Sequence, residues 1–80
     1  MSDIRLDQRG ALCPAPIIEL GKAAKQLGAG RIVLLADDPA ARSDVAAWCR
    51  LRKAQLVSQR EIGDESGTVE YVVEVGSQPS

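Results

Sequence analysis

The sequence predicts a two-layer α/β sandwich, of the α+β type, in which two helices cover one face of a small sheet. Strand-like and helix-like patterns follow one another along the 80 residues in the order β-α-β-α-β-β. Crossovers between parallel strands are right-handed, which places both helices on the same face. Apolar residues make up 45% of the chain and include only Trp48 and Tyr71 as aromatics, which suits a thin aliphatic core.

The first strand and the first helix are expected in the first third of the chain. Residues 3–9 (DIRLDQR) alternate apolar and polar side chains, which is typical of a short strand. After a loop at 10–13, a helix begins at Pro14 and ends at the glycines of 27–30. Proline suits the first helical position because its missing N–H would have had no partner there, and Pro16 still lies in the first turn.

The middle of the chain repeats this strand-and-helix pattern. The apolar run at 31–36 (RIVLLA) indicates a central strand. The segment 37–53 predicts a second helix, with Asp38 as its N-cap and Pro39 at its first helical position. Asp37 and Asp38 are both interpreted as capping residues, with a contact to a partner as the alternative.

The last part of the chain predicts a hairpin. Its two strands are expected at 54–62 and 68–75, on either side of a turn at 63–67. We expect a single domain over 1–76 and a flexible tail at 77–80.

One face of this sheet has no helix to cover it. It is either a docking surface or a polar, solvated face. Glu70 and Glu74, which alternate with valines in the last strand, favour the polar interpretation.

Charge and composition exclude several classes of function. Ten basic and eleven acidic side chains give a net charge of −1, whereas a free-standing nucleic-acid binder normally has a basic excess. The chain has no histidine, which excludes Ser-His and Cys-His catalysis, and two cysteines fall short of a zinc site. We therefore expect no cofactor, no metal and no direct binding of nucleic acid.

The sequence also predicts a cellular location. Its first residues do not resemble a signal peptide, and no window reaches membrane-spanning length. We therefore expect a cytoplasmic protein without a membrane contact, in which Cys13 and Cys49 stay reduced and form no disulfide.

Cys13 is the candidate reactive residue, because it directly precedes the first helix in the stretch ALCPAPIIEL. Backbone N–H groups and the helix dipole stabilise an anion at such a position, which favours the thiolate. The alternative is a small apolar side chain that packs inward. A C-x-x-C dithiol motif would need a cysteine where this chain has Pro16. A lone activated cysteine can still accept a sulfane sulfur, hold it as a persulfide and transfer it to another protein.

Four neighbours of Cys13 are candidates for supporting roles. Asp7 either orients the Cys13 loop by accepting backbone hydrogen bonds or is a turn residue at the end of a strand. Gly10 is expected to meet a backbone requirement of the loop. Pro14 and Pro16 begin the helix that presents Cys13.

Two features of the second helix have alternative interpretations. Cys49 is expected to be a packed core thiol, with a redox or second-carrier role as the alternative. Arg50, Arg52 and Lys53 form a charge run, which is either a solvated face or an electrostatic contact for an acidic donor enzyme or for tRNA held by that enzyme.

Two blocks of the sequence resemble the TusA/SirA-like family of sulfur-carrier proteins. LDQRGALCPAP (6–16) is similar to the family signature L-D-x-x-G-x-x-C-P-x-P. LADDPAARSDVAAWC (35–49) resembles its second block, an Asp-Asp-Pro turn that opens a helix ending near an aromatic-Cys pair. The resemblance extends from Leu6 to Val75. Position 15, the variable third position of C-P-x-P, is Ala15 here, whereas well-known tRNA-thiolating members have glutamate.

The resemblance implies a mixed four-stranded sheet with the order 1-2-4-3 and a persulfide on Cys13. It also implies a sulfur donor, which is a cysteine desulfurase or a rhodanese-type protein, and an acceptor protein. The acceptor would serve tRNA 2-thiolation, molybdenum-cofactor maturation or sulfur oxidation. Such a chain is a sulfurtransferase-type carrier rather than a self-sufficient enzyme, and a monomer most simply leaves its cysteine accessible.

Two other functions compete with the sulfur carrier. One is a regulatory or adaptor module that binds proteins through the open sheet face, with Cys13 incidental. The other is an RNA-binding domain, which the net charge disfavours.

Overall fold

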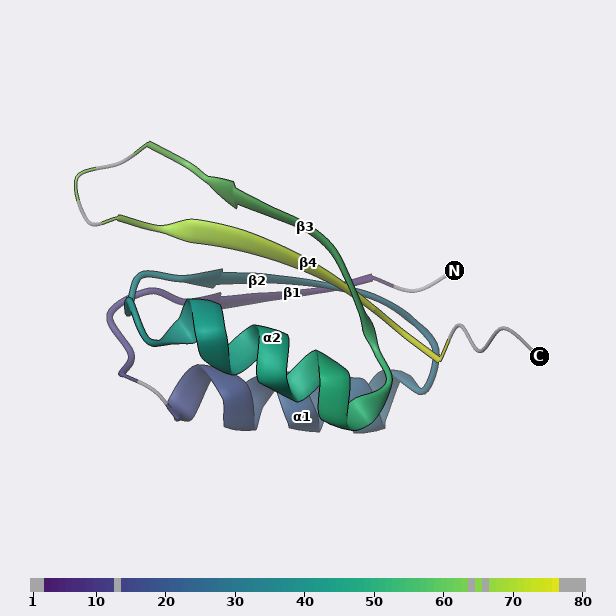
Figure 1. Ribbon diagram of the computed structural model, residues 1–80. Helices are drawn as coiled ribbons and strands as arrows, with labels where there is room; N and C mark the ends of the chain where they lie inside the picture. The colour runs from purple at the N-terminus through teal and green to yellow at the C-terminus, as the bar shows by residue number, and fades with distance from the viewer. Residues whose placement is uncertain (1–2, 13, 64, 66, 77–80) are drawn as a thin grey trace.

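The computed structural model describes residues 3–12, 14–63, 65 and 67–76, and in these residues two helices pack on one face of a four-stranded sheet (Figure 1). The elements are β1 (Asp3–Gln8), α1 (Ala15–Leu27), β2 (Gly30–Ala36), α2 (Ala41–Arg52), β3 (Gln55–Glu61) and β4 (Val69–Val75). The element order and the two layers confirm the predicted fold class. The predicted tail at 77–80 lies outside the described residues. Neither of the two helices described is long and apolar enough to cross a membrane.

The sheet is mixed and has the strand order β1-β2-β4-β3, as the family resemblance implies. β1 and β2 are parallel, and β4 is antiparallel to both β2 and β3. Because β1 and β2 end at the same edge of the sheet, the loops that follow them lie side by side (Figure 1). Both helices begin at this edge, so the loop before α1 and the loop before α2 are neighbours.

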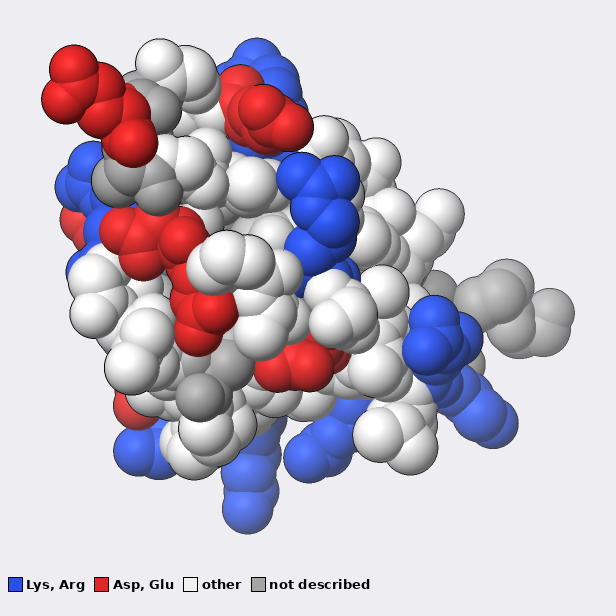
Figure 2. Space-filling view, turned by 60° about the vertical axis from the view of Figure 1, so that its left-hand side comes forward, with Lys and Arg blue, Asp and Glu red and all other residues white. Residues whose placement is uncertain are grey.

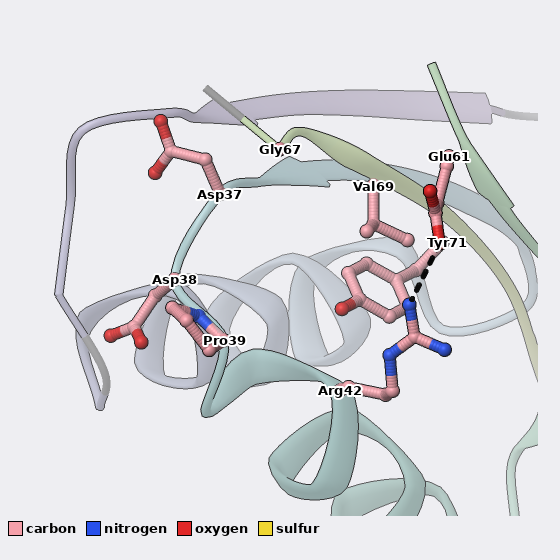
Figure 3. A pocket seen from close by; sticks show the side chains of 8 residues that line it. All are labelled: Asp37, Asp38, Pro39, Arg42, Glu61, Gly67, Val69 and Tyr71. Atoms are coloured by element: carbon pink, nitrogen blue, oxygen red, sulfur yellow. Dashed lines mark ion pairs between the residues drawn. The ribbon is translucent and has the colours of Figure 1, made fainter. Parts of the chain in front are cut away.

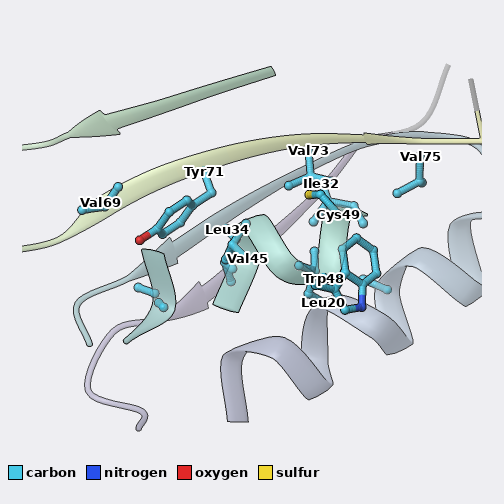
Figure 4. Packing of buried hydrophobic residues seen from close by; sticks show 13 residues of the cluster. Leu20, Ile32, Leu34, Val45, Trp48, Cys49, Val69, Tyr71, Val73 and Val75 are labelled. Carbon is cyan, nitrogen blue, oxygen red and sulfur yellow. The ribbon is translucent and has the colours of Figure 1, made fainter. Parts of the chain in front are cut away.

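The core lies between the sheet and the two helices (Figure 4). β2 contributes Ile32 and Leu34, both fully buried, and β4 contributes Tyr71 and Val73. Side chains of α1 and α2 close this layer from below, among them the fully buried Leu20. Buried positions alternate with half-buried ones along β4 and most of β2, which leaves one apolar face for the helices. A chain with two aromatic residues can therefore form a continuous core.

α1 begins one residue later than the sequence predicts. Pro14 is the N-cap residue, and the first helical residue is Ala15. Pro14 contributes its carbonyl, which accepts the amide of Ile18 at 3.0 Å. Pro16 is fully buried in the first turn, where its missing N–H leaves no hydrogen bond unformed.

The predicted start of α2 at Pro39 is wrong, because a turn precedes the helix. The carboxylate of Asp38 accepts the amide of Ala40 at 3.0 Å, and its carbonyl accepts the amide of Ala41 at 2.9 Å. The N-cap residue is Ala40, which makes no side-chain capping bond. Asp38 therefore stabilises the turn before the helix rather than the helix itself.

Lys53, which ends α2, has the left-handed backbone conformation with φ +56°. Residues other than glycine are disfavoured in this conformation by roughly 1–2 kcal/mol. We expect Lys53→Gly to stabilise the protein by about 1 kcal/mol, which thermal unfolding would detect as a rise in Tm of about 4–8 °C. Lys53→Ala is the control, because it removes the charge but keeps the strained conformation. An equal gain from both variants would contradict this explanation.

The face of the sheet without helices is mostly polar at its ends. Cross-strand ion pairs join Arg31 to Glu74 and Arg60 to Glu70, each at 3.3 Å. Both glutamates thus lie on the open face, as their alternation with buried residues of β4 predicts. Between these pairs the face is apolar but half-buried, at Val33, Leu35 and Val72.

Candidate functional site

The candidate site is the loop between β1 and α1, which holds Cys13. Cys13 itself lies outside the described residues, so the site is described through its neighbours. On the two sides of position 13, Leu12 has 76% of its surface exposed and Pro14 is exposed. The amide of Ala15 donates to the carbonyl of Leu12 at 2.9 Å, which holds together the chain segments before and after position 13.

The N-terminus of α1 can stabilise an anion. The helix has thirteen residues, enough for a full macrodipole, and no acidic side chain lies in its first turn. A negative charge near the start of the helix therefore meets the positive end of the dipole without a competing carboxylate from the helix itself. These are the electrostatic conditions that favour a thiolate over a thiol.

Asp37, the residue directly after β2, holds the loop that leads to Cys13. Its carboxylate accepts the amide of Gly10 with both oxygens, at 2.9 and 3.1 Å. Gly10 has φ +85°, a conformation that favours glycine, as its expected backbone role requires. The bond joins two loops that are 27 residues apart in the chain. Asp37 was predicted to cap α2, and it anchors the neighbouring loop instead.

Asp7, at the end of β1, is paired with Arg9. Its carboxylate accepts the Arg9 guanidinium at 2.6 and 2.8 Å and the Arg9 amide at 3.2 Å. The hydrogen bonds from the Arg9 side chain lower the pKa of Asp7 to about 2, so the carboxylate is ionised at neutral pH. Within the described part of the chain, all hydrogen bonds of this carboxylate go to Arg9. Asp7 thus forms the turn after β1, and Arg9 balances its negative charge.

An apolar hollow opens on the helix side of the site. Its volume is about 310 Å³, and it is lined by Pro14, Ile17, Asp44, Ala47, Trp48 and Leu51. Leu51 is 82% exposed. Exposed apolar surface thus lies beside the N-terminus of α1 and the loop that holds Cys13.

A second hollow, of about 330 Å³, lies on the sheet side of the α2 N-terminus (Figure 3). Asp37 and Asp38 line one side of it, and Arg42 and Glu61 face each other across the other side. The guanidinium of Arg42 lies 3.6 Å from the carboxylate of Glu61. On that side of the hollow the opposite charges of Arg42 and Glu61 balance each other.

Cys49 lies in the core, as predicted. It is 4% exposed, and burial raises the pKa of its thiol. A buried, protonated thiol is a poor nucleophile, so Cys49 is not accessible for the redox or second-carrier role considered as an alternative.

The bond between Asp37 and Gly10 is the feature of the site that the sequence analysis missed. It could have been found from two signals. β1 and β2 are predicted to be parallel neighbours, and Gly10 and Asp37 follow their last residues at similar distances. The carboxyl ends of parallel strands meet at one edge, where a carboxylate from one loop can reach an amide of the other.

Comparisons with known proteins agree on one family. Residues 4–75 match the family model described as Sulfurtransferase TusA. The sulfur carrier protein TusA of Pseudomonas entomophila is 36% identical over 70 residues, which are 86% of this chain and 84% of that protein. YrkI of Bacillus subtilis is 38% identical over 64 residues, which cover 79% of this chain and 85% of that protein.

The fold has a solved counterpart. A SirA-like protein from Desulfitobacterium hafniense superposes with a TM-score of 0.75 at 24% identity, and the match covers 91% of this chain and 97% of that one. At 24% identity, this similarity is evidence for the same fold and not for the same function.

Proposed function

Because this chain belongs to the TusA sulfurtransferase family, we propose that it is a sulfur carrier that holds a persulfide on Cys13. The observation that carries the proposal is the position of Cys13 in the matched signature, directly before Pro14, the N-cap residue of a helix whose first turn has no acidic side chain. The described residues on either side of Cys13 are exposed, which suits a group that must reach other proteins.

The transfer step is a thiolate attack on a persulfide. The thiolate of Cys13 attacks the outer sulfur of the donor's Cys–S–SH group, a new S–S bond forms on Cys13, and the donor's S–S bond breaks. The electron pair of that bond leaves on the donor cysteine as a thiolate, and the outer sulfur keeps its proton. No oxidant or reductant is consumed. The positive end of the α1 dipole stabilises both the attacking thiolate and the persulfide anion.

The donor in this proposal is a cysteine desulfurase or a rhodanese-type protein. The acceptor is a protein of tRNA 2-thiolation, molybdenum-cofactor maturation or sulfur oxidation. We propose that the carrier works as a monomer in the cytoplasm, where thiols stay reduced. The competing adaptor role has less support, since both glutamates of the open sheet face are already paired with arginines.

The test is to load the protein with sulfur. The chain is incubated with a cysteine desulfurase and free cysteine, and its intact mass is measured without reductant. We expect the mass to increase by one sulfur atom. This gain should vanish in Cys13→Ser and survive in the matched control Cys49→Ser. A wild-type protein that gains no sulfur, or sulfur bound to Cys49, would contradict the proposal.

A further inference from the structure

The two helices hold positive charge that the rest of the chain lacks. The two helices and Lys53, the C-cap residue of α2, contain six basic and two acidic side chains in residues 15–27 and 41–53, a net charge of +4, whereas the whole chain has −1. The six basic residues are Lys22, Lys25, Arg42, Arg50, Arg52 and Lys53. Figure 2 shows basic side chains projecting from the lower side of the molecule, where the helices lie in Figure 1. The domain is therefore polarised, with a basic helical layer beneath a sheet layer of net negative charge.

Most of this positive charge has no acidic partner in the described part of the chain. The ion pairs there include Lys22 with Glu19 at 3.4 Å and Arg42 with Glu61 at 3.6 Å. No ion pair among the described residues involves the other four basic side chains. Basic residues in a last helical turn also interact favourably with the helix dipole. The helix dipole therefore explains why Lys25, Arg50 and Arg52 lie in the last turns of their helices. It does not explain the apolar surface beside these residues.

An apolar groove between α1 and α2 lies among these charges. Its volume is about 390 Å³, and it is lined by Ile17, Ile18, Gly21, Lys22, Lys25, Trp48 and Arg52. Gly21 lies against Trp48 in this groove, since a Cβ atom there would be in van der Waals contact with Nε1 of Trp48, at 3.7 Å. The groove shares Ile17 and Trp48 with the apolar hollow beside Pro14, so the two form one surface that reaches the neighbourhood of Cys13.

We propose that this interhelical groove is a docking surface for an acidic segment of a partner protein, with apolar side chains on the groove floor and carboxylates against Lys25 and Arg52. Charge complementarity selects the acidic segment. Ile18 in the groove and Leu51 in the adjoining hollow, 52% and 82% exposed, provide the apolar contacts. The inference rests on the proposed function, since a carrier must bind the proteins with which it exchanges sulfur.

The groove favours protein over RNA as its occupant. RNA-binding surfaces without sequence preference stack bases on exposed aromatic rings. Trp48, the aromatic residue of this groove, is only 8% exposed. A long polyanion would also meet the negative charge of the sheet layer, whereas a short acidic segment fits within the basic layer.

The experiment uses Trp48 as a reporter, since it is the single tryptophan of the chain and lines the groove. The protein has the Cys13→Ser substitution, so binding is measured without sulfur chemistry. The probe is a synthetic amphipathic helical peptide of leucine and glutamate. The control probes are the same peptide with lysine in place of glutamate, and poly(U) RNA. We expect a saturable change in Trp48 emission with the glutamate peptide alone, and weaker binding as salt rises.

Charge reversal then locates the binding surface. The double variant Lys25→Glu and Arg52→Glu should weaken the affinity for the glutamate peptide by about tenfold or more. The single variants Lys25→Glu and Arg52→Glu are each compared with Arg5→Glu, a matched reversal of one charge. Arg5 is exposed on the opposite sheet face, so this control should change the affinity by less than about twofold. Circular dichroism verifies that each variant is folded.

Three results would overturn the docking surface: no binding of the glutamate peptide, equal loss in Arg5→Glu and the double variant, or tighter binding of poly(U). These results are distinct from a failure of the proposed function. A protein that binds the peptide but gains no sulfur from a desulfurase contradicts the carrier role alone, and one that gains sulfur but binds no peptide contradicts the docking surface alone.

Discussion

Gly76→Ala is expected to destabilise the protein by about 2–5 kcal/mol, a large part of the stability of so small a domain. Gly76 directly follows β4 and has φ +73°. A Cβ atom there would lie 2.5 Å from the carbonyl oxygen of Gly28 and 2.6 Å from Cα of Ala29. Both contacts are to backbone, so no side-chain rotation relieves them. Urea unfolding, followed by circular dichroism, measures the loss.

Gly67→Ala separates the two causes of this loss. Gly67 has φ +76°, nearly the same conformation, but a Cβ atom there would meet nothing within 4 Å. It therefore has the conformational cost of about 1–2 kcal/mol without the collision. The difference between the two variants measures the close approach of Gly76 to the turn between α1 and β2. Equal destabilisation would show that the collision is relieved by a backbone shift.

Much of this fold could be predicted because its pattern is local. The apolar run of β2 and the alternation of β4 depend on neighbouring residues, and right-handed crossovers place both helices on one face. The strand order came from the family resemblance, since the periodicity of a strand does not reveal its neighbours. The helix starts were misplaced by one residue at Pro14 and by two at Pro39, because proline fits both a first helical position and the turn before it.

The site was less predictable than the fold, because its contacts are between segments distant in the sequence. Aspartate is a residue type that often caps helices, so the sequence alone assigns Asp37 to the start of α2. The parallel pairing of β1 and β2 brings its carboxylate to the amide of Gly10 instead. The pairing of Asp7 with Arg9 spans two residues, yet an acidic side chain at the end of a strand has several possible partners. Cys49 was easier to interpret, because an apolar helix face with Trp48 predicts burial.

Asp37→Ala is expected to slow the loading of sulfur onto Cys13 by about tenfold, because the loop that leads to Cys13 loses its anchor on β2. The loss of global stability should be smaller, about 1 kcal/mol, because the hydrogen bonds are solvent-exposed. The rate is measured by intact mass at timed intervals after a cysteine desulfurase and cysteine are added. Urea unfolding of the same variant measures the stability.

Asp37→Asn separates two roles of the Asp37 side chain: its hydrogen bond to the Gly10 amide and its negative charge. Its side-chain oxygen can still accept the Gly10 amide, as Oδ1 of Asp37 does at 2.9 Å, but the negative charge is gone. If the hydrogen bond positions the loop, Asp37→Asn loads sulfur at nearly the wild-type rate and Asp37→Ala does not. If the carboxylate acted instead through its charge, both substitutions would lower the thiol pKa, and both variants would load sulfur faster than the wild type. Faster loading by both variants, or equal slowing of both, therefore contradicts the positioning role.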